Sequence, residues 1–355
     1  MKRILLVLLI FAVAGGSLFA EIEFWGRASS GIEVAIEDDT TFHVYNNRDR
    51  GGMFKFEFDA TYTTANEKAG GYGGLQVQDG EISGWDASVW FAPLDILTVN
   101  AGDIGAGFGT PGSLGANAAD GGPGVSLDIG PFSGLDLSVG IFPSGGEFGE
   151  TALGIGARYT SSGVFQIVAD LGYDGAGNDG DGSIGLSAGV DILALSSMGL
   201  TKLAVDVSAA NVTKLDTAGS VSVGPRINYK FGDFSGYVRA NVAIPVRDGQ
   251  ELNMRAGVQG QYPVTSTITA SLAAAYGLKG TVADTNGSPF DYRAGWNLVP
   301  GASISTADTS VVGIQPELRF NIDGKTLLLG YGFVTQLGDV SKTKSALYAN
   351  FVVGF

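Results

Sequence analysis

The sequence has no cysteine, a single histidine (His43), and charged residues at only 16% of its 355 positions. Without cysteine there can be no disulfide framework or thiolate metal site, and one histidine cannot supply a metal site of several imidazoles. Basic residues are also scarce: 21 Lys and Arg stand against 36 Asp and Glu, which disfavours nucleic-acid binding. No cofactor is predicted. An enzyme is disfavoured because the spacing around His43 offers no Ser-His-Asp set.

Long apolar runs are missing as well. After residue 20 no apolar run reaches the roughly 18 residues that identify a membrane-spanning helix. The run at the start, Ile4–Ala14, is shorter; it follows two basic residues and precedes small residues up to Ala20. This pattern is typical of a secretory signal peptide. We expect residues 1–20 to be a signal peptide cleaved near Ala20, and residues 21–355 to form the exported protein.

Glycine, by contrast, is abundant, with 56 residues, or about twice the usual share. Between glycine-rich turn signals the chain alternates apolar and polar residues, which indicates strands with two different faces. Most of these runs are about nine to twelve residues long, so they exceed ordinary soluble strands and match tilted membrane strands of about 9–11 residues. Clear examples are 54–62, 135–141, 221–231 and 252–259.

Both a soluble β-sandwich and a membrane β-barrel could use such strands. Where the alternation can be phased, charged residues avoid the apolar face, and the polar face is rich in Gly, Ser, Ala and Asn. That composition favours an all-β fold, a closed antiparallel transmembrane β-barrel with a crowded inner wall. Glycines such as Gly140, Gly156 and Gly172 fall on the inward phase, where a missing side chain would keep the lumen open.

The strand count follows from the rhythm of short turns and longer loops. We predict 18 strands, with 16 as the alternative, and interpret 279–310 as one long external excursion. Within it, 292–304 also alternates, and the sequence leaves open whether that segment is another strand.

The last strand alternates up to the final residue of the sequence, with apolar side chains at Leu347, Ala349, Phe351, Val353 and Phe355. A terminal aromatic residue behind an alternating strand resembles the C-terminal signal of bacterial outer-membrane β-barrel proteins. By this resemblance, Phe355 is the assembly signal that the barrel-assembly machinery reads.

In architecture the whole exported chain resembles the general porin class, although no motif singles out one porin. The resemblance implies a bacterial outer-membrane location, contact with outer-membrane lipid, and a homotrimer. It also implies a water-filled channel for passive diffusion of small hydrophilic solutes and ions. The alternative is a surface protein, or adhesin, whose external loops bind ligands; loops mostly under about fifteen residues favour the pore.

A third external loop that folds into the lumen is a porin feature, and 105–122 occupies that place in the count. The segment is small and flexible in composition. It lacks the usual carboxylate cluster, with only Asp103 and Asp120 at its ends, so the sequence leaves open whether it constricts the pore.

Charge is distributed unevenly along the chain. Between Lys68 and Lys202 a single basic residue, Arg158, faces fifteen acidic ones, whereas the remainder is balanced. The pore-lining candidates follow the same division: Glu57, Asp59, Asp86, Asp128 and Asp170 on early strands, and Arg226, Arg239, Arg255 and Arg319 on late strands. We hypothesise a transverse field across the lumen, acidic on one wall and basic on the other. The alternative is that these are merely solvated lumen residues.

Overall fold

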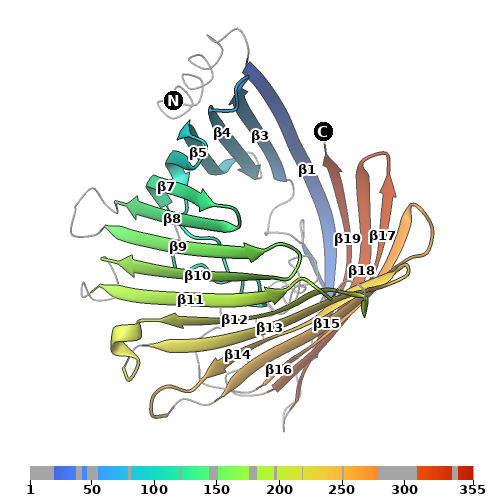
Figure 1. Cartoon of the computed structure of the whole chain (residues 1–355). Coiled ribbons are helices and arrows are strands. Elements are labelled where there is room, and N and C mark those ends of the chain that lie inside the picture. Colours follow the sequence, from blue (N-terminus) through green and yellow to red (C-terminus); the bar gives the residue numbers. More distant parts are fainter. Residues whose placement is uncertain are drawn as a thin grey trace.

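The computed structural model describes residues 20–36, 42–45, 55–78, 81–119, 122–143, 151–175, 182–195, 198–217, 219–249, 252–278, 310–337 and 343–354. They form one ring of antiparallel strands (Figure 1). The first half comprises β1 (Ala20–Ile36), β2 (Phe42–Tyr45), β3 (Lys55–Thr64), β4 (Ala69–Gln78), β5 (Glu81–Leu94), β6 (Leu97–Ile104), β7 (Gly122–Phe132), β8 (Leu135–Phe142), β9 (Ala152–Ser161) and β10 (Phe165–Asp174). The second half comprises β11 (Ser183–Ile192), β12 (Leu200–Ala210), β13 (Ser220–Phe231), β14 (Phe234–Ile244), β15 (Asn253–Pro263), β16 (Ile268–Gly277), β17 (Ser310–Ile322), β18 (Lys325–Leu337) and β19 (Thr343–Gly354). A 3-10 turn, η4 (Val212–Lys214), follows β12.

The ring closes between its first and last strands. One edge of β1 pairs with β19, from Arg27↔Gly354 to Ile36↔Ser345. The other edge pairs with β3 through residues 20–29 and with β2 through residues 33–36. Because β2 and β3 share that edge, the nineteen segments occupy 18 positions, and the prediction of a closed 18-strand barrel is confirmed.

The two ends of the barrel differ in their connections. At the end that holds the start of β1 and the end of β19, four hairpins have loops of only two residues, at 95–96, 133–134, 232–233 and 323–324. Asp323 and Gly324 both have positive φ, as a type I′ hairpin turn requires. The connections at the opposite end include the long ones, such as 105–121 and 278–309. Residues 279–309, including 292–304, lie outside the described ranges; among the described strands, β16 pairs directly with β17.

Each strand presents an apolar face outward and a polar face inward. On β12, Val205 and Val207 are 40% and 42% exposed, whereas Asp206 between them is fully buried. The same alternation runs around the ring, and large apolar side chains cover its outside. A closed sheet whose outer face is apolar is suited to a lipid surround. Within the described ranges, no helix is long and apolar enough to cross a membrane.

Candidate channel lumen

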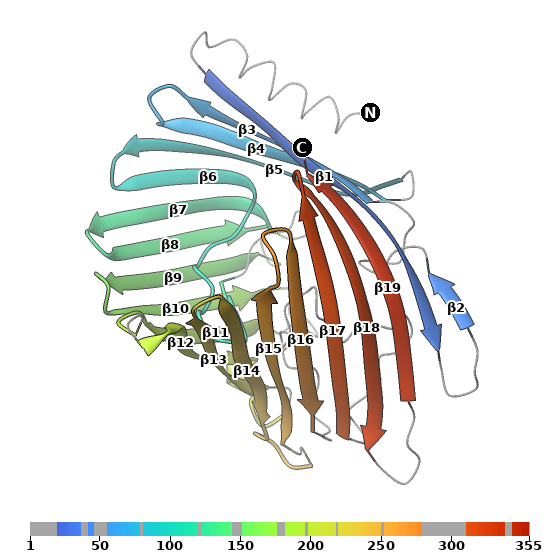
Figure 2. The same cartoon turned by 90° about the vertical axis from the view of Figure 1, so that its right-hand side faces the viewer.

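The connection between β6 and β7 lies inside the ring (Figure 2). Its described part, residues 105–119, packs against the inner face of β8–β14, and Thr110, Ser113 and Leu114 are buried there. Residues 105–119 therefore fold into the lumen; the sequence placed 105–122 as the third external loop and left open whether it constricts the pore. We call 105–119 the inner loop.

A buried carboxylate on β12 holds the tip of the inner loop. Asp206 accepts hydrogen bonds from the hydroxyl of Thr110 (2.7 Å) and from the backbone N–H groups of Leu114 (3.3 Å) and Gly115 (3.1 Å). An ionised carboxylate accepts from several donors at once, and such charge-assisted bonds are stronger than bonds between neutral groups. The strand thus contributes the charge and the loop contributes the donors.

Three further strands hold the loop by polar contacts. Asp170 on β10 accepts from the backbone N–H of Phe108 (3.1 Å), and Ser187 on β11 accepts from that of Ala118 (3.0 Å). On β14, Asn241 accepts from the hydroxyl of Ser113 (2.5 Å). Asp170, predicted to line the pore, is 3% exposed and lies beneath the loop. Asp170 therefore holds the loop in place and does not lie on an open part of the channel wall.

Glycines on the inward phase make room for the loop. A Cβ atom at Gly172 would overlap the carbonyl oxygen of Ala118, and one at Gly156 would overlap the Cα of Gly107. The sequence suggested that these missing side chains keep the lumen open. The structure gives them a different role, because the backbone of the loop occupies the space they leave.

One aromatic and one apolar contact also hold the loop against the barrel wall. The guanidinium of Arg158 lies 4.6 Å from the ring centre of Phe108 and donates two hydrogen bonds to Asp136, of 3.0 and 2.8 Å. Ala106 and Ala119 are buried against Phe142 of β8. These contacts fix the two ends of the loop, and Asp206 fixes its tip.

The early wall carries carboxylates that the sequence predicted to face inward. Glu57 binds Arg27 of β1 and accepts from Gln76 (2.7 Å). Asp59 accepts from the hydroxyl of Tyr72 (2.6 Å), and Asp86 lies beside both groups where Gly74 leaves space. Asp128 on β7 accepts from Asn100 (2.8 Å) and Ser138 (2.7 Å). Inward carboxylates therefore extend from β3 to β7, and several are held by polar neighbours.

The late wall carries the predicted arginines. Arg226 on β13 and Arg239 on β14 are cross-strand partners, and both guanidinium groups lie near the ring of Tyr237, at 6.0 and 4.7 Å. Arg255 on β15 is the cross-strand partner of Asn241, on the same face. Arg319 on β17 lies 3.7 Å from Glu317. The described residues thus place four arginines over β13–β17, away from the acidic strands β3–β7.

Apart from Asp170, which it placed on the inner face, sequence reasoning missed the residues that hold the loop, above all Asp206 and Asn241. Asp206 could have been found, because it is an acidic residue at the inward phase in the middle of β12. Phe355, the predicted assembly signal, and nearly all of the predicted signal peptide lie outside the described residues. Among the residues that the structure describes, no group of three or more His, Asp or Glu side chains could hold a metal ion.

The chain forms an 18-strand ring with short turns at one end and a loop folded inside it, and this fold can be compared with solved structures. This is the fold of the outer-membrane porins. Three Pseudomonas aeruginosa barrels are similar over nearly their whole length: OpdQ (TM-score 0.57, 8% identity, 95% of this chain and 97% of that one), OpdO (0.56, 10%, 94% and 97%) and the outer membrane protein opdK (0.54, 8%, 94% and 99%).

No family model matches the chain, and no curated protein matches it. Identities of 8–10% to the three barrels show a shared fold alone. The predicted porin-like architecture is confirmed at that level.

Proposed function

We propose that this chain forms a water-filled channel across the bacterial outer membrane, through which small hydrophilic solutes and ions diffuse passively. The observation that carries the proposal is the inward polar face of a closed 18-strand ring. A barrel of about 8 strands is filled by its own side chains, whereas one of 16–18 strands leaves an aqueous channel. The apolar outer face supports contact with outer-membrane lipid.

The inner loop sets the width of this channel in our proposal. It is held by at least four strands, from β10 to β14, on one side of the lumen. A loop held in this way would narrow the lumen from that side, and the opposite wall, β1–β5, lies across the ring. The permeating solute would pass between the loop and that wall.

The two charged walls give the channel its selectivity. Carboxylates on β3–β7 and arginines on β13–β17 would create a transverse field that orients dipolar solutes and disfavours apolar ones. Glu57, Asp59, Asp86, Asp128, Arg226, Arg239, Arg255 and Arg319 are the residues we propose to line the channel. A structure of one similar barrel, OpdK, contains vanillate, so a barrel of this fold accommodates a small organic solute.

Swelling of proteoliposomes tests the proposal. Purified protein in vesicles should admit glycine and arabinose rapidly and exclude poly(ethylene glycol) above a size limit, as a passive pore does. Vesicles without protein give the background rate. If swelling stayed at that background with barrels shown to be folded, the pore would be refuted and the surface-ligand alternative favoured.

Assembly partners follow from the resemblance alone. Recognition of Phe355 by the barrel-assembly machinery and association into a homotrimer are both proposals. Deleting Phe355 should lower the amount of barrel inserted into the outer membrane, and cross-linking of intact cells should give a three-chain species. Normal insertion without Phe355, or a single-chain species only, would contradict the respective proposal.

A further inference from the structure

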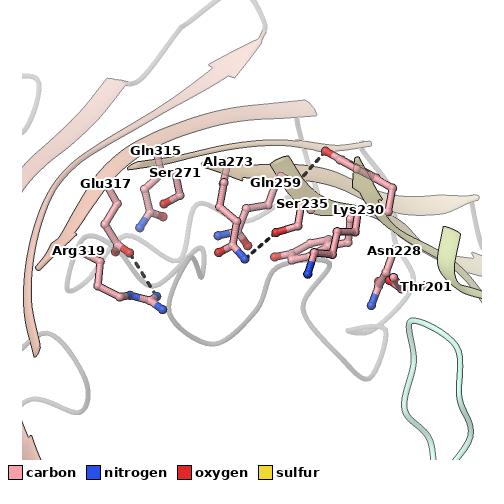
Figure 3. A pocket seen from close by; sticks show the side chains of 14 residues that line it. Thr201, Asn228, Lys230, Ser235, Gln259, Ser271, Ala273, Gln315, Glu317 and Arg319 are labelled. Atoms are coloured by element: carbon pink, nitrogen blue, oxygen red, sulfur yellow. Dashed lines mark hydrogen bonds and ion pairs between the residues drawn. The ribbon is translucent and has the colours of Figure 1, made fainter. Parts of the chain in front are cut away.

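A hollow of about 550 Å³ lies on the inner face of the late wall, toward the short-turn end of the barrel (Figure 3). Its lining comes from β12–β17. Small-molecule sites in proteins have volumes of about 300–1,000 Å³. The hollow is therefore large enough for a solute of one or two rings.

Small residues lie in and beside this hollow. Gly257, Ala275 and Gly313 are consecutive cross-strand partners on β15, β16 and β17, and all three are buried. Ala273, one step nearer the short turns, is in the lining itself. Ala273 therefore contributes a small side chain to the lining, and the larger residues Gln259 and Gln315 lie on either side of it.

The centre of the hollow carries no charge. Its main row runs across five strands through direct cross-strand partners: Asn228, Tyr237, Gln259, Ala273 and Gln315. The next row, toward the turns, contains Ser235, Gln261 and Ser271, with 3.0 Å between the amide nitrogen of Gln261 and the hydroxyl of Ser235. Each side-chain amide offers both donors and acceptors, and each hydroxyl can do either.

The charged groups of the lining lie at its edges. Lys230 is exposed at one edge (Figure 3). At the other edge Glu317 lies 3.7 Å from Arg319 and accepts a hydrogen bond of 2.9 Å from Tyr348. Much of the negative charge of Glu317 is therefore compensated locally, and a bound solute would meet mainly neutral donors and acceptors.

We propose that this hollow, the amide pocket, binds an uncharged polyhydroxylated solute, such as a mono- or disaccharide, on its way through the channel. Sugar hydroxyls donate and accept, so they match a surface of amides and hydroxyls, whereas an apolar solute would leave those groups without partners. A carboxylate only accepts hydrogen bonds, so it would leave the amide oxygens at the centre without a donor. The inference rests on the proposed channel function, because the solute reaches the pocket through the lumen.

Two separate measurements test the pocket and the channel. Saturation-transfer NMR on the folded protein in detergent reports sucrose binding, and single-channel recording reports ion conductance. We expect saturable sucrose binding, with weaker signals from gluconate and from poly(ethylene glycol) of similar mass. Gluconate binding more tightly than sucrose, or no sucrose binding, would overturn the pocket assignment. Absence of conductance would overturn the channel proposal instead.

Substitutions locate the binding. Gln259→Leu and Gln261→Leu should each weaken sucrose binding about tenfold, the effect of losing one or two hydrogen bonds. Gln166→Leu is the matched control. Gln166 is an inward glutamine on β10 that contacts Thr160, outside the pocket, and its loss should leave sucrose binding within about twofold. Equal effects of all three substitutions would contradict the assignment.

Discussion

The hydroxyl of Thr110 donates a hydrogen bond of 2.7 Å to the carboxylate of Asp206, 96 residues further along the chain. This contact joins the inner loop to the middle of β12, where Asp206 is fully buried. Because Leu114 and Gly115 donate to the same carboxylate, Asp206 is the most connected anchor of the loop.

Asp206→Ala should release the tip of the loop. Each hydrogen bond to a charged acceptor contributes about 1.5–3 kcal/mol, and lumen water replaces part of it, so the docked loop should lose about 2 kcal/mol. We expect higher and noisier single-channel conductance and faster proteolysis within 105–119. Asp191→Ala is the control, because that carboxylate on β11 lies 3.6 Å from Lys202 and makes no hydrogen bond to the described residues of the loop. Unchanged conductance and protease resistance in Asp206→Ala would contradict this role.

Adding a single methyl group at Gly172 should also displace the loop. A Cβ at Gly172 would overlap the backbone of Ala118, whereas one at Gly185, on the adjacent strand, would lie 3.6 Å from the Cβ of Ala118. Gly172→Ala should therefore raise conductance, and Gly185→Ala should not. Equal conductance of the two variants would show that the loop does not rest on Gly172.

Reversing the charge of the basic wall should change ion selectivity. In a KCl gradient, Arg226→Glu/Arg255→Glu should shift the reversal potential toward cation preference by several-fold in permeability ratio, because the lumen loses its positive wall. The shift should be larger at low salt, where the Debye length is longer. Lys325→Glu, at a short turn, gives the effect of a charge change outside the lumen. If the double variant behaved like wild type, the arginines would be merely solvated residues.

Neighbouring residues on one strand should respond unequally to the same substitution. Leu272 on β16 is 56% exposed on the outer face, and Ser271 faces the lumen. Leu272→Arg should lower the free energy of unfolding from lipid vesicles by about 2–4 kcal/mol, and Ser271→Arg by less than about 1 kcal/mol. Urea titration with tryptophan fluorescence measures both. Greater loss from Ser271→Arg would mean that the two faces are assigned the wrong way round.

The sequence was sufficient to predict the barrel because its signal is local. Alternation along 135–141 or 252–259 fixes which face each residue joins, and glycine-rich turns mark where strands end. The same phase placed Glu57 and Arg226 on the inner face. The interruption between β2 and β3 was not predicted, because it depends on pairing of both segments with one edge of β1.

The contents of the lumen could not be predicted in the same way. The inner loop is fixed by partners 62 to 128 residues away, such as Asp170 and Asn241, and no periodic pattern links such positions. The amide pocket is a property of five adjacent strands, visible only once their register is known. The sequence showed that side chains are missing at the inward glycines. It did not show that a loop fills the space that these glycines leave.

Planar-bilayer recording of the refolded wild-type protein tests the channel most directly. The account predicts discrete, stable conductance steps in KCl, with a size limit set by poly(ethylene glycol) exclusion. Circular dichroism and resistance to proteolysis should first establish that the barrel is folded. A folded barrel that inserts into the bilayer and gives no conductance steps would contradict the account.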